Sequence, residues 1–597
     1  MVTQVPGGEL TTVERSLVEH VGHGEWLDLA ADDEAVDEAA MRSWGDSRTC
    51  RATVIRDILR GRLVAHPDPH GLRLRGARIT GQLDLAKLTT DVSLQLRDCL
   101  LEAGIIAQDA RLASMSLSGC QLECSAEPPL YAEGLTCTVL DLSGARIIGN
   151  TDAGAVRLVG AHIVGSLYCQ RATLRNGSGP ALNGDALQVS QSMFIDDGFT
   201  AAGGGEDGAV RLVGAHVGIS LNCGRAALRN NSGPALVADG LRIGLSAFLR
   251  DGFTATGTGE GGAVRLVGAS IGGQFSCIKA TLRNDSGPAL LAEALQVGQN
   301  MFLTDGFTAT GAGEVGAIRL TGARIGGSLD CTSAALRNDC GPALVAHGLQ
   351  VGGDMRLAEG FVVSGGGKDV ALDLKGARVD GTLVFDPGCL EHSADRHRRL
   401  AVDGLTYAGV PEQISGRAWL ELLRDGTPSY AAQPYRQLAA GYRSLGAERQ
   451  TRGILMAQRE DELTRTDTGW PERLWGKITK VTLGYGYQPW RALLFLAVVV
   501  AISCLLAVAL GSHGALAQTT VTAAPGRPCT VIQRLSVGLD LNLPVGASLA
   551  RAGCELTGDP ASATGAWLAA SGWVLGLLAW VFAALFIAGF TSAVRKT

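Results

Sequence analysis

Short runs of alternating apolar and polar residues, separated by glycine-rich turns, fill the middle of the chain. Val156 and Leu158 flank one polar position, and Leu167 and Cys169 flank another. A period of two residues is typical of short β-strands. The pattern therefore predicts a mainly β region from about residue 71 to 388, without a helical period inside it.

The strand pattern recurs with a long, regular period. The string RLVGA begins at Arg157, Arg211 and Arg265, and RLTGA begins at Arg319. Such a repeat predicts a solenoid, because each unit buries its apolar face against the next one. Each unit divides into two related halves, since IVGSLYC at 163–169 resembles VSQSMFI at 189–195. We expect a parallel β-solenoid over 71–388, with four repeats at 154–369, about 27 residues in each coil and about a dozen coils.

Helical patterns flank the predicted solenoid. Val13, Leu17 and Val21 share one helical face within residues 1–70, which indicates a helical cap over the first coil. Residues 389–489 show a second set of helical patterns and are expected to form a helical neck between the solenoid and the end of the chain.

Two uncharged apolar segments, residues 492–510 and 567–590, are each long enough to cross the ~30 Å hydrocarbon core of a bilayer. Basic residues precede the first segment and follow the second, so both flanks and both termini are expected in the cytoplasm. The loop 511–566 within the membrane domain 490–597 then faces outward. Because the segment 1–30 contains several glutamates and no apolar core, it does not resemble a secretory signal peptide. We expect a protein of the cell membrane, with two spans and a cytoplasmic solenoid.

The outward loop contains two cysteines, Cys529 and Cys554. Disulfides persist outside the cytosol, so we predict a disulfide between them; two unpaired thiols in a mobile loop are the alternative. The mostly apolar segment 531–549 between them predicts a short helix on the outer membrane surface.

Composition excludes several classes of protein. Glycine accounts for 81 of 597 residues, while 46% of the residues are hydrophobic and 18% are charged. This composition is too apolar for a disordered protein and suits a membrane component. The formal net charge of -6 gives no global field for capturing nucleic acid, which argues against nucleic acid as a partner.

Stacked repeats turn each repeated residue into a column, and two of the columns are arginine. Their members are Arg157, Arg211, Arg265 and Arg319, and Arg175, Arg229, Arg283 and Arg337. Alternation with Val156 and Leu158 points the first column outward, where guanidinium groups bind phosphates or an acidic protein surface. Glu206, Glu260 and Glu314 form a column of opposite charge, so the alternative is a solvated face that neutralises itself.

Two repeated sets of potential ligands have structural interpretations. One set is Cys169, Cys223, Cys277 and Cys331. Two coils place successive members ~9.6 Å apart, beyond the ~7 Å limit for a disulfide, so we interpret them as small core residues. His162 and His216 are replaced by Ser270 and Arg324 in the next repeats, so they predict neither a metal site nor a catalytic base.

Glycine and asparagine columns are also interpreted as structural. Three G-x-G-x-x-G motifs begin at Gly203, Gly257 and Gly311. A strand pattern rather than a helix follows each one, so we expect turns and not dinucleotide sites. The asparagine column comprises Asn176, Asn230, Asn284 and Asn338. We expect these residues at a turn with left-handed backbone and side chains bonded to neighbouring backbone.

Several segments resemble one protein family. They are GLRLRGARITG at 71–81, the DGFTATG repeats, QPYRQLAAGYRSLG at 433–446, GYGYQPWRALL at 484–494 and FIAGFTSAVRK at 586–596. The chain resembles, over nearly its whole length, actinobacterial membrane proteins with pentapeptide-like repeats, often catalogued as membrane-associated oxidoreductases. The resemblance implies a membrane-attached solenoid, and the label implies a nicotinamide or flavin cofactor.

The residues themselves favour a membrane-tethered cytoplasmic scaffold for an unknown protein partner, because solenoids expose long surfaces whereas enzymes require convergent polar groups. We assign no catalytic residue, metal site or cofactor from the sequence. An oxidoreductase is the alternative hypothesis. A channel formed by the two spans is a weaker third, since neither span contains a charged residue.

Overall fold

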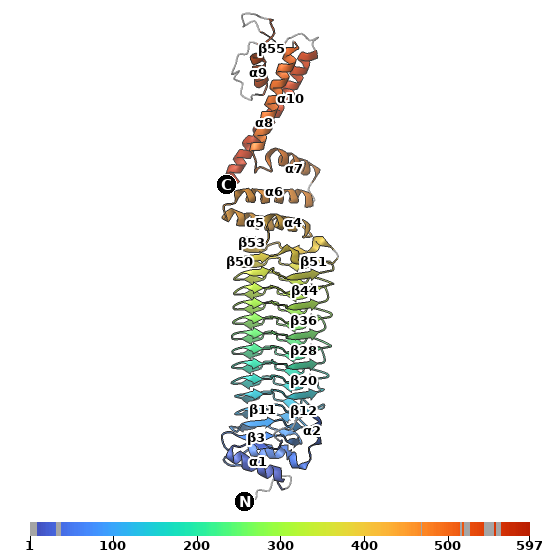
Figure 1. Cartoon of the computed structure of the whole chain (residues 1–597), viewed down its shortest axis with the longest axis vertical. Helices are drawn as coiled ribbons and strands as arrows, with labels where there is room; N and C mark the ends of the chain where they lie inside the picture. The colour runs from blue at the N-terminus through green and yellow to red at the C-terminus, as the bar shows by residue number, and fades with distance from the viewer. Residues whose placement is uncertain are drawn as a thin grey trace. The chain divides into compact units, whose positions relative to one another are not determined.

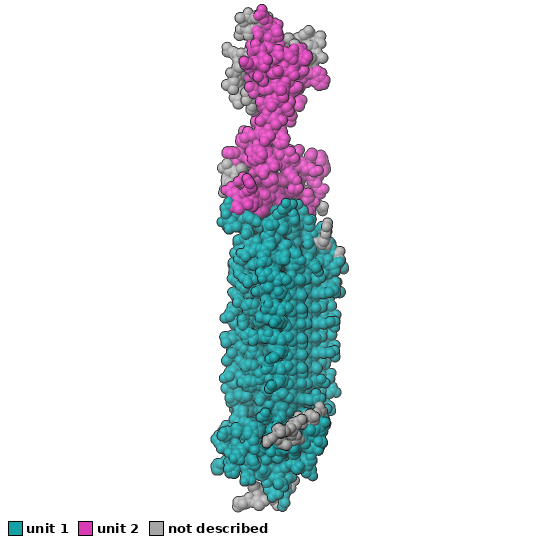
Figure 2. All heavy atoms as spheres, viewed as in Figure 1, with its two compact units in different colours: residues 1–446 teal, residues 447–597 magenta. Residues whose placement is uncertain are grey.

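The computed structural model forms two compact units, Met1–Gly446 and Ala447–Thr597 (Figure 2). The structure describes residues 9–30, 38–393, 395–466, 469–513, 516–518, 526–542, 554–556 and 563–596. The first unit is a parallel β-solenoid with helices, and the described residues of the second form helices and one two-stranded sheet (Figure 1).

Three parallel sheets build the solenoid, with 26, 14 and 13 strands. We call them sheets A, B and C. Each typical coil contributes two strands to sheet A and one to each of the others, which gives about thirteen coils. The predicted parallel solenoid is confirmed. Its coils alternate between a shorter and a longer form, as the register pairs Ser270–Gln296 and Gln296–Arg324 show.

One repeat illustrates how the strands are formed. Its strands are β33 Val264–Arg265, β34 Ser270–Ile271, β35 Phe275–Ser276, β36 Thr281–Asn284, β37 Leu290–Leu291, β38 Gln296–Val297, β39 Met301–Phe302 and β40 Thr308–Gly311. Apolar side chains alternate into the core, where Phe253 and Phe307 are fully buried. The four repeated cysteines also lie in the core, as predicted. Burial raises the pKa of the Cys277 thiol, which keeps it protonated.

The asparagine column is only partly as expected. Each side chain bonds neighbouring backbone: Nδ2 of Asn284 donates to the carbonyl oxygens of Gly259 and Pro288, and Oδ1 accepts from the N–H of Ser286. However, these asparagines end strands of sheet B and do not have positive φ. The expected left-handed backbone is wrong, because the side chain is buried between coils and not displayed at a turn.

Strand pairing extends beyond both predicted limits of the solenoid. Near the N-terminus, β1 Leu27–Asp28 pairs with β3 Leu72–Arg75, and β2 Thr49–Arg51 pairs with β4 Arg78–Thr80. Near the other end, β51 Leu390–His392, β52 Leu400–Ala401 and β53 Thr406–Glu412 continue the three sheets. The limits at residues 71 and 388 are therefore too narrow, because inward apolar residues such as Leu400 and Leu405 continue the coil after the repeated motif is lost.

The described residues that accompany the first coils form the helices α1 Thr12–His23, α2 Glu38–Ser43 and α3 Ala52–Leu59. Glu14 of α1 is fully buried and accepts hydrogen bonds from the guanidinium Nε and Nη2 atoms of Arg51 at 2.7 and 2.6 Å. Burial alone raises the pKa of Glu14, but these bonds and those from the N–H groups of Thr11 and Arg51 outweigh it and hold the pKa below its ordinary value. This ion pair fixes α1 to strand β2.

Two helices follow the last coil within the first unit: α4 Gly416–Asp425 and α5 Gln433–Ser444. From α5, the side-chain amides of Gln433 and Gln437 donate to the carbonyl oxygens of Leu405 and Tyr407 at 2.8 and 2.7 Å. These bonds satisfy backbone groups at an otherwise open sheet edge. The segment predicted as one helical neck, 389–489, thus begins with strands and is divided between the two units.

The second unit contains α6 Glu448–Arg465, α7 Trp470–Leu483, α8 Trp490–Ser512, β54 Leu516–Gln518, α9 Val531–Asp540, β55 Cys554–Leu556 and α10 Ala563–Lys596. Helix α8 and residues Ala570–Thr591 of α10 are each long and apolar enough to cross a membrane. The two helices pack together, with the rings of Phe495 and Phe582 stacked 5.4 Å apart. Both predicted apolar segments fall on these helices.

The helix expected over 531–549 is shorter than predicted. Helix α9 ends at Asp540, and residues 543–549 lie outside the described part of the chain. It packs directly against α8, since a Cβ atom on Gly538 would lie 2.6 Å from Cα of Cys504. Glycine therefore permits a close helix contact on the apolar span itself, which the sequence pattern did not indicate.

Candidate functional site

A groove of about 460 Å³ lies on the outer surface of sheet A. It extends across β34, β38, β42 Arg324–Ile325, β46 Gln350–Val351 and β50 Arg378–Phe385. One side of the groove is formed by polar residues that pair in register from strand to strand, one in each coil: Ser270, Gln296, Arg324, Gln350 and Arg378. The groove therefore presents a row of side chains ~4.8 Å apart along the coil stack.

Glycines form the floor of this groove: Gly272, Gly298, Gly326 and Gly352. A Cβ atom on Gly298 would lie 2.1 Å from the carbonyl oxygen of Gly272, and one on Gly326 would lie 2.4 Å from that of Gly298. Only glycine fits at this spacing, so the missing side chains create the depression. The carbonyl oxygens of Gly272 and Gly298 accept no hydrogen bond from the described residues, which leaves acceptors available along the floor.

Most of the polar side chains along the groove have no hydrogen-bond or ion-pair partner among the described residues. Among the described residues, Gln296, Arg324 and Gln350 form neither a side-chain hydrogen bond nor an ion pair. Arg378 instead pairs with Asp380 at 2.6 Å. Amide groups and one free guanidinium thus face solvent above backbone acceptors. This set is suited to an extended polar chain that carries a carboxylate.

The first arginine column is neutralised within the solenoid. Each member pairs with an acid of the preceding coil: Arg157 with Glu133 at 2.8 Å, Arg211 with Asp185 at 2.6 Å, Arg265 with Asp239 at 2.6 Å and Arg319 with Glu293 at 2.5 Å. Glu206, Glu260 and Glu314, which were expected to oppose these arginines, are not their ion-pair partners. The acids that neutralise the arginines belong instead to the adjacent coil, which comes half a repeat earlier in the chain.

The second arginine column lies on sheet B and is more exposed. Arg175, Arg229, Arg283 and Arg337 alternate in register with Ala202, Thr256, Thr310 and Ser364. Arg283 and Arg337 pair with Asp285 and Asp339, which follow closely in the chain, at 2.8 and 2.9 Å. Local acids therefore partly neutralise this column as well.

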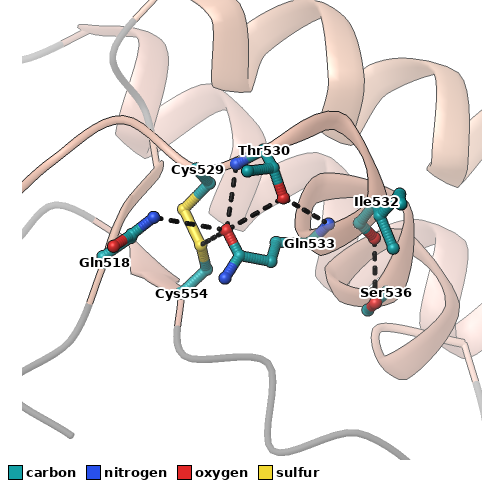
Figure 3. Close-up of a disulfide and its surroundings, with 7 residues drawn as sticks. All are labelled: Gln518, Cys529, Thr530, Ile532, Gln533, Ser536 and Cys554. Carbon is teal, nitrogen blue, oxygen red and sulfur yellow. Dashed lines mark hydrogen bonds between the residues drawn. A yellow bond between two sulfur atoms is a disulfide. The ribbon is translucent and has the colours of Figure 1, made fainter. Parts of the chain in front are cut away.

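Outside the solenoid, Cys529 and Cys554 are joined by a disulfide at a sequence separation of 25 (Figure 3). This is the pair proposed from the sequence. The bridge connects the start of α9 with β55, whose residue Cys554 pairs with Gln518 of β54. With Leu516, the two cysteines form a small core against Leu506 and Leu510 of α8. The disulfide itself thus lies against the end of the first apolar helix.

No match to this chain is found among protein-family models, curated proteins or solved structures.

The glycine motifs connect strands of the solenoid. Each glycine motif begins at the last residue of a sheet B strand, Gly203, Gly257 or Gly311, and continues through the turn that precedes β25 Val210–Arg211, β33 or β41 Ile318–Arg319. Gly259 and Gly262 there have φ of 82° and 90°, which favours glycine. Among the described residues, no group of three or more His, Cys, Asp or Glu side chains is suited to holding a metal.

The groove was not among the sites expected from the sequence. Its signal is a polar residue followed by an inward Ile or Val and then a glycine, which recurs in the four successive coils that contain Gly272, Gly298, Gly326 and Gly352. His162, His216, Ser270 and Arg324 lie one full repeat apart, so another coil lies between each of them and the next.

Proposed function

We propose that this protein is a membrane-tethered solenoid scaffold whose groove on sheet A binds a protein partner. The observation that carries the proposal is the row of unpaired Gln296, Arg324 and Gln350 side chains above a glycine floor. An extended peptide segment with acidic residues fits this chemistry, because its carboxylate pairs with the guanidinium and its amides bond the glutamines and the floor.

The groove is a better candidate than the arginine columns. Arg265 and its equivalents already pair with acids of the solenoid, so a partner would have to displace an existing ion pair. Arg324 has no such competitor among the described residues. Its interaction with an acidic partner therefore involves a smaller loss of internal bonding.

The membrane part of the proposal rests on α8 and α10. Both are long and apolar enough to span a bilayer, and basic residues at 465–491 and 595–596 favour cytoplasmic flanks. We place the solenoid and both termini in the cytoplasm and the disulfide loop outside. We also propose that the chain belongs with the actinobacterial membrane proteins that it resembles, on the strength of the sequence segments quoted above.

Capture from native membranes tests the scaffold function. Lightly crosslinked membranes containing the affinity-tagged full chain are solubilised, and the recovered proteins are compared for wild type, Arg324→Glu and Arg283→Glu. Arg283 is an arginine on sheet B, which makes it the matched control for charge reversal. We expect Arg324→Glu to lose a partner that wild type and the control retain.

Equal recovery of every captured protein by Arg324→Glu contradicts binding in the groove. The same purified protein is tested for flavin absorbance and for saturable NAD(P)H binding. Stoichiometric cofactor supports the oxidoreductase alternative and overturns the scaffold proposal.

A further inference from the structure

Helix α7 has an apolar face that no described part of its unit covers. Trp470, Leu474, Ile478 and Val481 follow one another at steps of four, four and three residues, so they share one side of the helix. These side chains are large and solvent-facing: Trp470 is 76% exposed, Leu474 51%, Ile478 41% and Val481 57%, with Trp475 beside them at 59%. Five exposed large apolar residues on a single helix of this length form a patch that is unusual for a surface in water.

The other side of α7 is fixed by packing, so the helix cannot turn the patch inward. Gly476 is buried against α6, where an added Cβ atom would lie 2.4 Å from Cδ1 of Leu463. Leu483 is buried near α10, and an added Cβ on Gly589 would lie 3.0 Å from its Cδ2 atom. The small-residue side of α7 therefore faces its own unit and the apolar side faces away.

Basic side chains line the edge of the apolar patch. Arg473, Lys477 and Lys480 lie on α7 next to Trp470 and Val481 around the helix. Lys480 pairs with Glu460 at 2.5 Å, whereas Lys477 forms no ion pair among the described residues. An apolar face bordered by lysine and arginine is typical of helices that lie in a membrane interface.

We propose that α7 lies flat in the headgroup region of the membrane, with its apolar face inserted into the same leaflet that the adjacent end of α8 enters. Only the short segment 484–489 separates α7 from α8. Leu493 and Leu494 at the start of α8 are also exposed apolar residues, so exposed apolar side chains lie on both sides of this short connection. The closeness in sequence to an apolar span favours lipid over a second protein as the occupant.

The ligand class is a bilayer surface with anionic lipid. Trp470, Trp475 and Trp490 suit the headgroup level, where amphipathic rings partition. Lys477 and its neighbours are attracted by the negative surface potential of a cytoplasmic leaflet. The inference rests on the membrane tether proposed above and adds a second, surface-lying contact that orients the helices before the span.

Spin labels on the full chain test this placement. Single cysteines replace Leu474 and Val481 on the patch, Glu472 as an exposed control on the same helix, and Leu505 as a reference on α8. The exposed Cys340 and the half-buried Cys124 and Cys504 are first changed to serine. Each labelled protein is placed in nanodiscs of phosphatidylcholine and phosphatidylglycerol, and collision rates with oxygen and with a water-soluble nickel chelate are measured.

We expect labels at 474 and 481 to collide with the nickel chelate about fivefold less often than the label at 472, while remaining accessible to oxygen, as for side chains buried ~5–10 Å into the interface. Nickel access at 474 and 481 equal to that at 472 overturns the inference, and so does low access to both reagents, which indicates a protein contact. The label at 505 separates the two proposals. If it collides with oxygen but not with the nickel chelate, while the labels on α7 collide freely with the chelate, only the interfacial position of α7 is refuted. If the label at 505 itself collides freely with the nickel chelate, the membrane tether is refuted.

Discussion

Replacing one buried asparagine tests how the coils are held together. Asn284 is 1% exposed. Its Nδ2 atom donates to the carbonyl oxygens of Gly259 and Pro288, each at 2.9 Å, and its Oδ1 atom accepts from the N–H of Ser286 at 3.0 Å. Asn284→Ala removes three hydrogen bonds worth about 1 kcal/mol each. The carbonyl of Pro288 keeps the bond that it accepts from the N–H of Ala263 at 3.0 Å, whereas the carbonyl of Gly259 loses its asparagine donor. We expect a loss of about 3 kcal/mol of local stability.

The neighbouring Asp285→Ala is the matched control. Asp285 is mostly exposed and pairs with the exposed Arg283, and exposed ion pairs contribute roughly 0–1 kcal/mol. Any general effect of placing an alanine in this coil therefore appears in the control as well. The difference between the two variants isolates the asparagine contacts.

Amide hydrogen exchange of the full chain in nanodiscs measures the effect coil by coil. In a solenoid each coil contacts only its neighbours, so the change is confined to peptides near β32 Thr254–Gly257, β36 and β40. A loss of about 3 kcal/mol accelerates exchange through local opening roughly a hundredfold. Acceleration by Asn284→Ala no greater than that by Asp285→Ala refutes the proposed role of the asparagine column.

Three further predictions concern the first helix, the arginine column and the loop. Because the folded state holds the pKa of Glu14 below its ordinary value, the stability that Glu14 contributes is complete above the unfolded pKa of about 4.3 and is lost as pH falls through the folded pKa. The protection of the α1 amides, taken at each pH relative to the intrinsic exchange rate at that pH, should fall in acid for wild type, whereas Glu14→Gln should show low protection already at pH 7 with little further change. An acid response like that of wild type in this variant contradicts the assignment. Arg265→Gln leaves Asp239 without its 2.6 Å ion pair and should reduce local stability by about 1 kcal/mol in the same assay, an expectation that fails if exchange is unchanged. On intact cells, an impermeant thiol reagent should label Cys529 and Cys554 only after mild reduction; labelling without reductant contradicts the disulfide, and none after reduction contradicts the outward loop.

The long internal repeat was sufficient to predict a parallel solenoid, because strands in this fold pair with the equivalent strand of the next coil. It was misleading about side-chain partners. Arg265 meets Asp239 of the preceding coil, and Gln296 stacks on Arg324 of the following coil. Comparing residues one full repeat apart skips the coil that lies between them, so both the neutralising acids and the groove were overlooked.

Other features depend on close approaches that have no sequence period. Gly538 allows α9 to lie against Cys504 of α8, and nothing in the alternation of apolar residues specifies that contact. The coils formed by β51, β52 and β53 keep inward apolar residues without the repeated glycine motif, so pattern matching ended the solenoid too early. In these last coils the alternation of apolar and polar residues is retained, although the sequences of the coils are no longer similar.

Contact mapping along the groove tests the central claim most directly. A photo-crosslinking amino acid is placed at Gln296 or Gln350 in the groove, and at Thr281 or Thr308 on sheet B as control positions in the repeat that contains Gln296. Irradiation of native membranes is predicted to give one shared crosslinked product from both groove positions, absent from both sheet B positions and lost when Arg324→Glu is added. No product from the groove positions, or the same product from all four, contradicts a scaffold that binds its partner in this groove.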